Sequence, residues 1–312
     1  MKLSIVTTLY KSASHIDEFY ERITNEVKKV TDDYEIIFVN DGSPDNSLEK
    51  VITLYKKDKH VKVIDLSRNF GHHKAIMTGL ANAKGEFVFL IDCDLEEEPE
   101  LLTEFWEKLH HEKDVDVIYG VQDSRKGGIF EKLSGKLFYK IFNFFSGIEI
   151  PNNFLTIRLM NRNYVRQLIR FEEKEVVFSI LTVLNGFNSM KTVVKKLSHS
   201  PSSYTLIAKF GLLFNVITAS SAKPLWLAFN VGLSITIGSL GYIIYLVFRK
   251  LFFNVGVDGW TSVMVSISFF GGMIILFLGV IGIYLAKIFI EVKNRPYTII
   301  KKTYENTSRS EK

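Results

Sequence analysis

The chain has few of the residues that form disulfides or interrupt helices and strands, with one cysteine and six prolines among 312 residues. The single Cys93 excludes an intrachain disulfide, and with it a disulfide-stapled secreted fold. From Met1 the chain runs directly into a strand-like stretch without the apolar core and cleavage site of a secretory leader, so we expect no signal peptide. The net charge is only +5. Its basic residues gather near apolar segments, which favours a membrane surface and not nucleic acid as partner.

Long apolar runs, by contrast, are present. Hydrophobic residues make up 47% of the chain, and two uncharged runs at 225–248 and 259–286 hold much of this excess. About 20 apolar residues suffice to cross the hydrocarbon core of a bilayer. We therefore expect residues 225–286 to form two transmembrane helices, joined by the short segment 249–258 as an antiparallel hairpin.

The distribution of basic residues predicts the orientation of this hairpin in the membrane. They are frequent before the first run and in the tail 287–312, whereas the connecting segment carries only Arg249 and Lys250. The positive-inside rule then predicts a multi-pass protein of the plasma (inner) membrane with both termini in the cytoplasm.

Two further segments combine apolar and basic residues at helical spacing. In 128–148, aromatic and aliphatic residues alternate with lysines, and 201–224 lies just before the first apolar run. Each is read either as a helix that packs on the core or as an amphipathic helix in the membrane interface. We expect 128–148 to be interfacial and 201–224 to be a juxtamembrane helix.

The first 120 residues alternate short β-branched runs with amphipathic stretches. Runs at 35–39, 61–64 and 87–91 are typical of buried strands, and the stretches between them are typical of helices. This alternation predicts an α/β domain, residues 1–200, with a mostly parallel sheet covered on both faces. Ligands of such sheets bind beyond the carboxyl ends of the strands.

The clearest chemical motif follows the run 87–91, where Asp92 and Asp94 flank Cys93 and the acidic stretch 96–98 precedes a helix. Helix N-termini favour acids, which accounts for the glutamates but not for Asp92 and Asp94. Two carboxylates at a strand end are suited to Mg²⁺ or Mn²⁺, which prefer oxygen ligands and are often shared with substrate phosphates. We therefore expect a divalent metal that neutralises a departing diphosphate.

Two other turns follow strands. Asp41 and Ser43 lie in an Asp-Gly-Ser turn, which is either a plain helix cap or a site where Asp41 accepts hydrogen bonds from a nucleotide. The segment 66–74 contains Arg68 and the pair His72 and His73, cationic groups that can meet a diphosphate. No third ligand spacing accompanies the two histidines, which argues against zinc.

Together these motifs resemble family 2 glycosyltransferases, and more narrowly the polyprenyl-phosphate sugar transferases, such as dolichol-phosphate mannose synthases and bactoprenol glucosyltransferases. The resemblance covers almost the whole chain in order. It rests on the segments 4–10, 40–43, 67–71, 92–96, 119–122, 124–127, 158–160 and 202–204 and on the two-helix anchor.

The resemblance implies a GT-A fold and an inverting, metal-dependent transfer of a sugar from a nucleotide-sugar, a UDP-sugar being favoured, to polyprenyl (undecaprenyl) phosphate. It also implies a homo-oligomer, a tetramer in the bactoprenol type. By the same resemblance, Asp92, Asp94 and Arg158 are catalytic. The implied nucleotide-sugar residues are Thr7, Leu9, Tyr10, Asp41, Arg68 and Asp92; the acceptor-phosphate residues are Arg125, Lys126 and Arg158; and the metal ligands are Asp92, Asp94 and Glu96.

Thr156 departs from the pattern, since relatives carry an Asp there. A phosphate acceptor is already nucleophilic and needs no general base, whereas a sugar hydroxyl does. The alternative function is therefore a membrane-bound transferase that adds a sugar to a glycan or lipid hydroxyl in surface polysaccharide assembly, with bases sought among Glu172, Glu173 and Glu175. A third interpretation is a scaffold that keeps the fold without activity.

Overall fold

The computed structural model describes residues 1–112, 114–122, 143–145, 153–195, 211, 217–218, 221–253 and 259–306. The chain divides into two compact units. The first comprises Met1–Tyr139, Ile148–Ser203 and Arg295–Lys312, and the second comprises Lys140–Gly147 and Tyr204–Asn294. The chain thus leaves the first unit twice and returns to it at its end.

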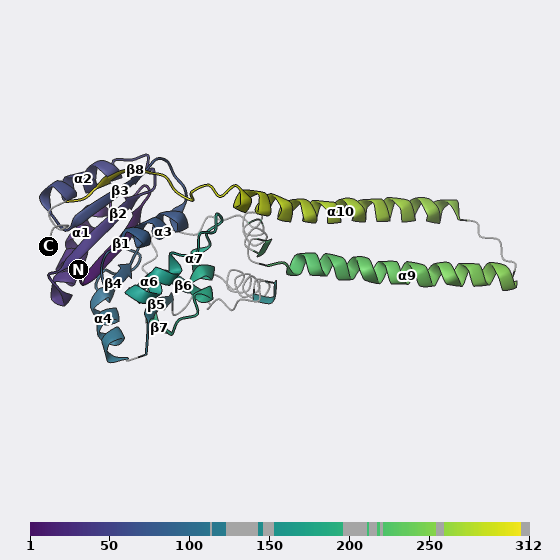
Figure 1. The fold of residues 1–312 in the computed structure, drawn as a ribbon, viewed down its shortest axis with the longest axis horizontal. Coiled ribbons are helices and arrows are strands. Elements are labelled where there is room, and N and C mark those ends of the chain that lie inside the picture. The colour runs from purple at the N-terminus through teal and green to yellow at the C-terminus, as the bar shows by residue number, and fades with distance from the viewer. Residues whose placement is uncertain are drawn as a thin grey trace. The chain divides into compact units, whose positions relative to one another are not determined.

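The first unit is built on an eight-stranded sheet with the order β7-β5-β6-β4-β1-β2-β3-β8 (Figure 1). The four neighbours β4, β1, β2 and β3 run parallel, while β6 and β8 run antiparallel to their neighbours. The predicted α/β fold with a mostly parallel sheet is confirmed. The strands are β1 (Leu3–Leu9), β2 (Tyr34–Asn40), β3 (Val61–Leu66), β4 (Phe87–Leu90), β5 (Val117–Gln122), β6 (Phe154–Asn161), β7 (Ser189–Val194) and β8 (Ile300–Tyr304).

Helices cover both faces of this sheet, so its central strands are almost entirely buried and consist mostly of apolar residues. In β2 every residue is buried, and alternate side chains point to opposite faces. Ile36 and Phe38 join the core formed with α1, α2 and α4, whereas Ile37 and Val39 join the core formed with α3, α6 and α7. The helices are α1 (Ile16–Val30), α2 (Ser47–Lys57), α3 (His72–Asn82), α4 (Leu101–His111), α6 (Arg162–Leu168) and α7 (Phe178–Leu184).

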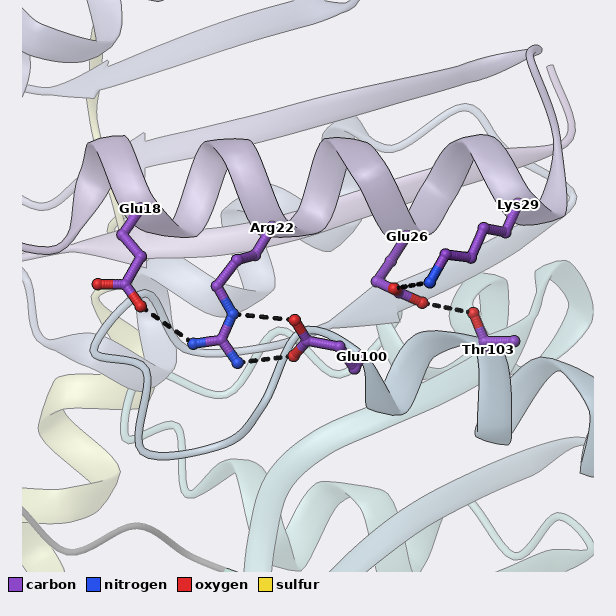
Figure 2. Close-up of polar contacts among 6 residues, drawn as sticks. All are labelled: Glu18, Arg22, Glu26, Lys29, Glu100 and Thr103. Atoms are coloured by element: carbon purple, nitrogen blue, oxygen red, sulfur yellow. Dashed lines mark hydrogen bonds and ion pairs between the residues drawn. The ribbon is translucent and has the colours of Figure 1, made fainter.

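Polar contacts join α1 to the start of α4 (Figure 2). Arg22 donates through Nε and Nη2 to the two carboxylate oxygens of Glu100, at 2.9 and 2.7 Å. This bond lowers the pKa of Glu100. One helical turn further along α1, the buried Glu26 accepts a hydrogen bond from Thr103 at 2.7 Å and pairs with Lys29. Because Glu100 ends the acidic segment that follows β4, these contacts fix that segment at its far end.

The last strand of the sheet comes from the end of the chain. β8 pairs antiparallel with β3, in register Ile64 with Thr303 and Asp65 with Lys302 (Figure 1). The tail 287–312 therefore contains a strand of the first unit, which the basic composition of this segment did not predict.

The second unit contains two long helices, α9 (Lys223–Phe253) and α10 (Trp260–Val292), which form a hairpin. They include both predicted apolar runs, and α10 continues beyond residue 286. Each contains a window long and apolar enough to cross a membrane, Lys223–Leu246 and Phe269–Val292, of which no part is buried. The predicted helices at 128–148 and 201–224 lie almost entirely outside the described residues.

Candidate functional site

The carboxyl ends of four adjacent parallel strands meet at one edge of the sheet. The chain proceeds from β1 to β2 and β3 on one side, and then returns to place β4 on the other side of β1. Such a reversal creates a crevice between neighbouring strand ends, here those of β1 and β4. The segments that follow these four strands include the predicted residues Tyr10, Asp41, Arg68 and Asp92.

Asp41 links two of these strand ends. Its backbone N–H donates to Leu9 O at the end of β1, at 3.0 Å. Its side chain, only 2% exposed, accepts from the backbone N–H groups of Phe70 and Gly71, at 2.7 and 3.0 Å. Burial raises the pKa of Asp41, while these two hydrogen bonds favour its ionised form. Asp41 thus anchors the loop that follows β3, a role not visible in the sequence.

The loop 67–71 also rests against the turn at Gly42. Gly42 has φ of +60°, and a Cβ atom there would lie 2.4 Å from Asn69 N and 2.5 Å from Arg68 C. Only glycine fits this close approach without displacing the loop. Arg68 itself is exposed, and its guanidinium lies 4.2 Å from the centre of the Phe70 ring. The loop therefore presents a cation at the same sheet edge as Asp41.

We expect Gly42→Ala to open this loop contact. Both the positive φ, at about 1–2 kcal/mol, and the overlap with Asn69 destabilise the variant. The matched control is Gly186→Ala, since Gly186 also has a positive φ, +68°, but its nearest Cβ neighbour is 3.7 Å away. Thermal unfolding should show a larger loss for Gly42→Ala than for Gly186→Ala. Equal losses would mean that the overlap at residues 68–69 costs nothing.

His72, the first residue of α3, connects the ends of β1 and β4. Its Nδ1 lies 3.0 Å from Thr8 Oγ1, and its Nε2 lies 3.5 Å from Asp92 Oδ1. One imidazole therefore lies within ion-pair distance of Asp92, one of the predicted metal ligands. His72 was predicted from the sequence as a group that can meet a diphosphate, whereas its contact with Asp92 was not predicted.

Asp92 and Asp94 differ in environment. The Asp92 side chain is 22% exposed, whereas Asp94 lies on the surface and accepts a hydrogen bond from Glu96 N at 3.0 Å. Between them Cys93 is buried, and burial raises the pKa of its thiol. The next residue, Leu95, has a left-handed φ of 60° and turns the chain.

The predicted metal ligands Asp92, Asp94 and Glu96 all lie in the segment that follows β4, and their joint role in holding a cation stays a prediction. Among the residues that the structure describes, no group of three or more His, Cys, Asp or Glu side chains is placed to hold a metal ion. The turn at Leu95 and the hydrogen bond from the Glu96 backbone to Asp94 shape this segment. What the strand end offers is a pair of carboxylates.

Arg158 lies on β6, across from Leu90 of β4, two residues before Asp92. Its side chain is 1% exposed, and it donates to Thr156 O at 2.9 Å and to Leu155 O at 3.1 Å. The guanidinium packs against the rings of Phe154 and Phe178, at 4.8 and 4.5 Å. Burial lowers its pKa to about 10, so it remains charged at neutral pH. These contacts hold Arg158 within the protein, and its role at the acceptor phosphate stays a prediction.

The remaining predicted residues are distributed as follows. Thr7 is fully buried, and within the described residues its hydroxyl has no hydrogen-bond partner. Leu9 is buried, while Tyr10 is 48% exposed at the end of β1. The predicted acceptor-phosphate residues Arg125 and Lys126 lie outside the described residues.

The turn before α2 contains a strongly hydrogen-bonded acid. Burial alone would raise the pKa of Asp45, but hydrogen bonds from Ser43, Ser47 and Ala13 N lower it from 3.8 to about 2. This turn holds the chain after β1, because Ser43 Oγ also accepts from Lys11 N at 2.7 Å. Asp45 therefore stabilises the fold when ionised.

The pH dependence of this contribution is predictable. A carboxylate with a lowered native pKa stabilises the fold above its unfolded pKa, and the contribution disappears as pH falls through the native pKa. We expect Asp45→Asn to lose about 1 kcal/mol of stability at pH 7, since the side chain is exposed, and about half of that at pH 3. Thermal unfolding at both pH values tests this against Asp32→Asn, an exposed acid outside the turn. A difference that stays constant with pH would contradict it.

The chain is similar to several known proteins. The model of the family described as Glycosyl transferase family 2 matches residues 4–169. A chain of Mycobacterium tuberculosis (strain CDC 1551 / Oshkosh) with a general glycosyltransferase name is 44% identical over 97% of this chain and 89% of its own length. The "Bactoprenol glucosyl transferase" of Shigella phage SfII is 31% identical over 97% of this chain and 99% of its own. Among solved structures, mannosyl-3-phosphoglycerate synthase from Rubrobacter xylanophilus has a TM-score of 0.48 at 14% identity, covering 69% of this chain and 72% of its own.

Proposed function

The chain belongs to glycosyl transferase family 2 and is a glycosyltransferase, and from this premise we propose that it moves a sugar from a nucleotide-sugar to polyprenyl (undecaprenyl) phosphate with inversion at the anomeric carbon. One observation carries the proposal. Asp41, the loop 67–71 and Asp92 converge at the carboxyl ends of adjacent parallel strands, in a chain that also has two long apolar helices.

In this proposal, the nucleotide-sugar binds along that sheet edge. Asp41 fixes the loop 67–71, so that Arg68 faces the diphosphate, and Tyr10 lies beside the nucleotide. A guanidinium is suited to phosphate oxygens because its N–H groups match them in pairs. UDP is the favoured nucleotide.

The donor set of the site fits a divalent cation held jointly by protein and substrate. Asp92 and Asp94 supply two carboxylates, and Glu96 follows them in the same segment. Mg²⁺ is commonly bound by one or two carboxylates plus substrate phosphates and water, and Mn²⁺ suits the same oxygen ligands. When bound, the ion would neutralise charge on the departing diphosphate. His72 positions Asp92 for this role.

A phosphate acceptor explains the absence of an acid at Thr156. Polyprenyl phosphate carries its own nucleophilic oxygen, and a second pKa of about 6 leaves it largely dianionic at neutral pH. No general base is then required. The relatives named bactoprenol glucosyl transferases, which match over nearly their whole length, support a lipid phosphate of this kind.

The two apolar helices would anchor the chain in the membrane that contains its lipid acceptor. We propose that α9 and α10 cross the plasma membrane as a hairpin, with both termini on the cytoplasmic side, where nucleotide-sugars are found. The basic residues before α9 and after α10 support this direction. A tetrameric assembly belongs to the same proposal, by analogy with bactoprenol-type enzymes.

Transfer of radiolabelled sugar in isolated membranes tests the proposal. A panel of UDP- and GDP-sugars is supplied with Mg²⁺ or Mn²⁺ and undecaprenyl phosphate, and membranes lacking the chain serve as control. We expect organic-extractable, acid-labile label that requires both metal and lipid phosphate. Label that appears only with a preassembled lipid-linked glycan would refute the phosphate acceptor and indicate a hydroxyl.

A further inference from the structure

The segment that follows the second apolar helix reaches the base of the loop 67–71. Beyond the β3–β8 ladder, Ser67 N donates to Ile299 O at 2.9 Å. Ser67 is the residue with which this loop leaves the sheet. The far end of the same loop is held by Asp41, through Phe70 and Gly71. The loop is thus fixed at one end by β2 and at the other by the end of the chain.

The same segment also contacts the helix that the loop leads into. Thr298 Oγ1 and Thr78 Oγ1 of α3 form a hydrogen bond at 2.8 Å. Tyr297 packs on the core cluster of α3, α6 and α7, and Phe70 of the loop packs on that same cluster. Both elements that flank the loop, β3 before it and α3 after it, therefore rest on residues 297–304.

Ion pairs and ring contacts secure the rest of the segment. Glu305 pairs with Lys62 at 3.4 Å and with Lys84, and Tyr304 lies against Tyr55 with ring centres 5.9 Å apart. Lys62 is nearly buried, so its pairing with Glu305 holds the end of the segment firmly. The segment is therefore held by ion pairs and a ring contact in addition to the β3–β8 ladder.

We propose that residues 297–305 are a positioning segment for the nucleotide-sugar site: by holding Ser67 and α3, they keep the loop 67–71 in the conformation that binds the donor. This rests on the proposed function, because it assumes that the loop contacts the nucleotide-sugar. It follows that the donor site is complete only when the chain beyond the hairpin has returned to the sheet.

The double variant Tyr297→Ala/Thr298→Val in the full chain tests this, with Lys57→Gln, an exposed position at the end of α2 and outside the segment, as control. Hydrogen exchange of the Phe70 and Gly71 amides should accelerate about tenfold in the double variant and remain unchanged in the control. The KM for the nucleotide-sugar should also rise about tenfold, with the KM for the lipid acceptor unchanged. A purely structural role would lower the amount of active enzyme and leave both KM values as they are.

Unchanged exchange at Phe70 and Gly71, with faster exchange confined to β8, would overturn the proposal. If exchange rises throughout the domain, the double variant is too unstable for this test. The single variant Thr298→Val is then measured instead, because it removes one hydroxyl and keeps the side-chain shape. A wild-type chain that transfers no sugar from any donor would refute the proposed function. The exchange measurement would then still decide whether residues 297–298 hold the loop.

Discussion

Replacing Asp92 by Asn should lower sugar transfer about 100- to 1,000-fold while leaving the protein folded. The change removes one negative charge at the end of β4 and keeps the size of the side chain. Stabilisation of a leaving group by a bound cation contributes several kcal/mol, and each 1.36 kcal/mol corresponds to a factor of ten in rate. Rates in membranes that contain equal amounts of wild-type and variant protein measure the effect.

The matched control for this substitution is Glu98→Gln. Glu98 lies in the same acidic segment and is exposed, so its loss changes the local charge equally without touching the strand end. We expect its rate to stay within a factor of two of wild type. Equal rates for wild type and Asp92→Asn would remove Asp92 from the mechanism, and an equal loss in both variants would indicate that only the overall charge of the segment matters.

Replacing Arg158 by Ala should have the largest effect on stability. The substitution removes a completely buried side chain from between two aromatic rings and leaves the carbonyls of Leu155 and Thr156 without their donor. Large-to-small substitutions in a core cost about 2–5 kcal/mol, and a buried carbonyl without a partner costs about 1–3 kcal/mol more. We expect a loss of about 4 kcal/mol, or a fall in Tm on the order of 10 °C.

The exposed Arg166 of α6 provides the control, since Arg166→Ala removes the same side chain from the surface. Its Tm should change by less than about 2 °C, in keeping with substitutions away from buried groups. The sequence suggested instead that Arg158 binds the acceptor phosphate. In that case Arg158→Ala would keep its Tm and raise only the KM for the lipid, a result that would contradict the structural role described here.

The first half of the fold was predictable from the sequence for a physical reason. Strands that are buried on both faces are continuously apolar, and 35–39, 61–64 and 87–91 stand out against their amphipathic neighbours. All three coincide with observed strands, the last of them ending one residue earlier, at Leu90. The two long apolar helices were equally visible, because an uncharged apolar stretch of about 20 residues is the length that a membrane-crossing helix needs.

β8 was not predictable, because it lies at an edge and contains Lys301 and Lys302. Charged residues at sheet edges discourage unwanted pairing. They also interrupt the apolar pattern by which a strand is recognised in a sequence. Its pairing with β3 joins residues far apart in the chain, which local patterns do not report.

For the site, the sequence identified which residue types gather at the strand ends but not what each one touches. The contact of Asp41 with the nucleotide stays a prediction, whereas its hydrogen bonds from the N–H groups of Phe70 and Gly71 were not predicted. The role of Arg158 was implied by the family resemblance, and its burial opposite Leu90 was not predicted. Burial depends on neighbours that come from other parts of the chain, which explains why the sequence did not predict these contacts.

The late position of β8 in the chain affects how the protein is made. Leu66 of β3 leaves the ribosome about 230 residues before Ile300, so at roughly 5–20 residues per second β3 waits on the order of 10–50 seconds for its partner. During that interval the nascent domain has an open sheet edge, a template for pairing with other chains. Premature termination anywhere in the hairpin would leave that edge open permanently, so truncated products should be prone to aggregation and degradation.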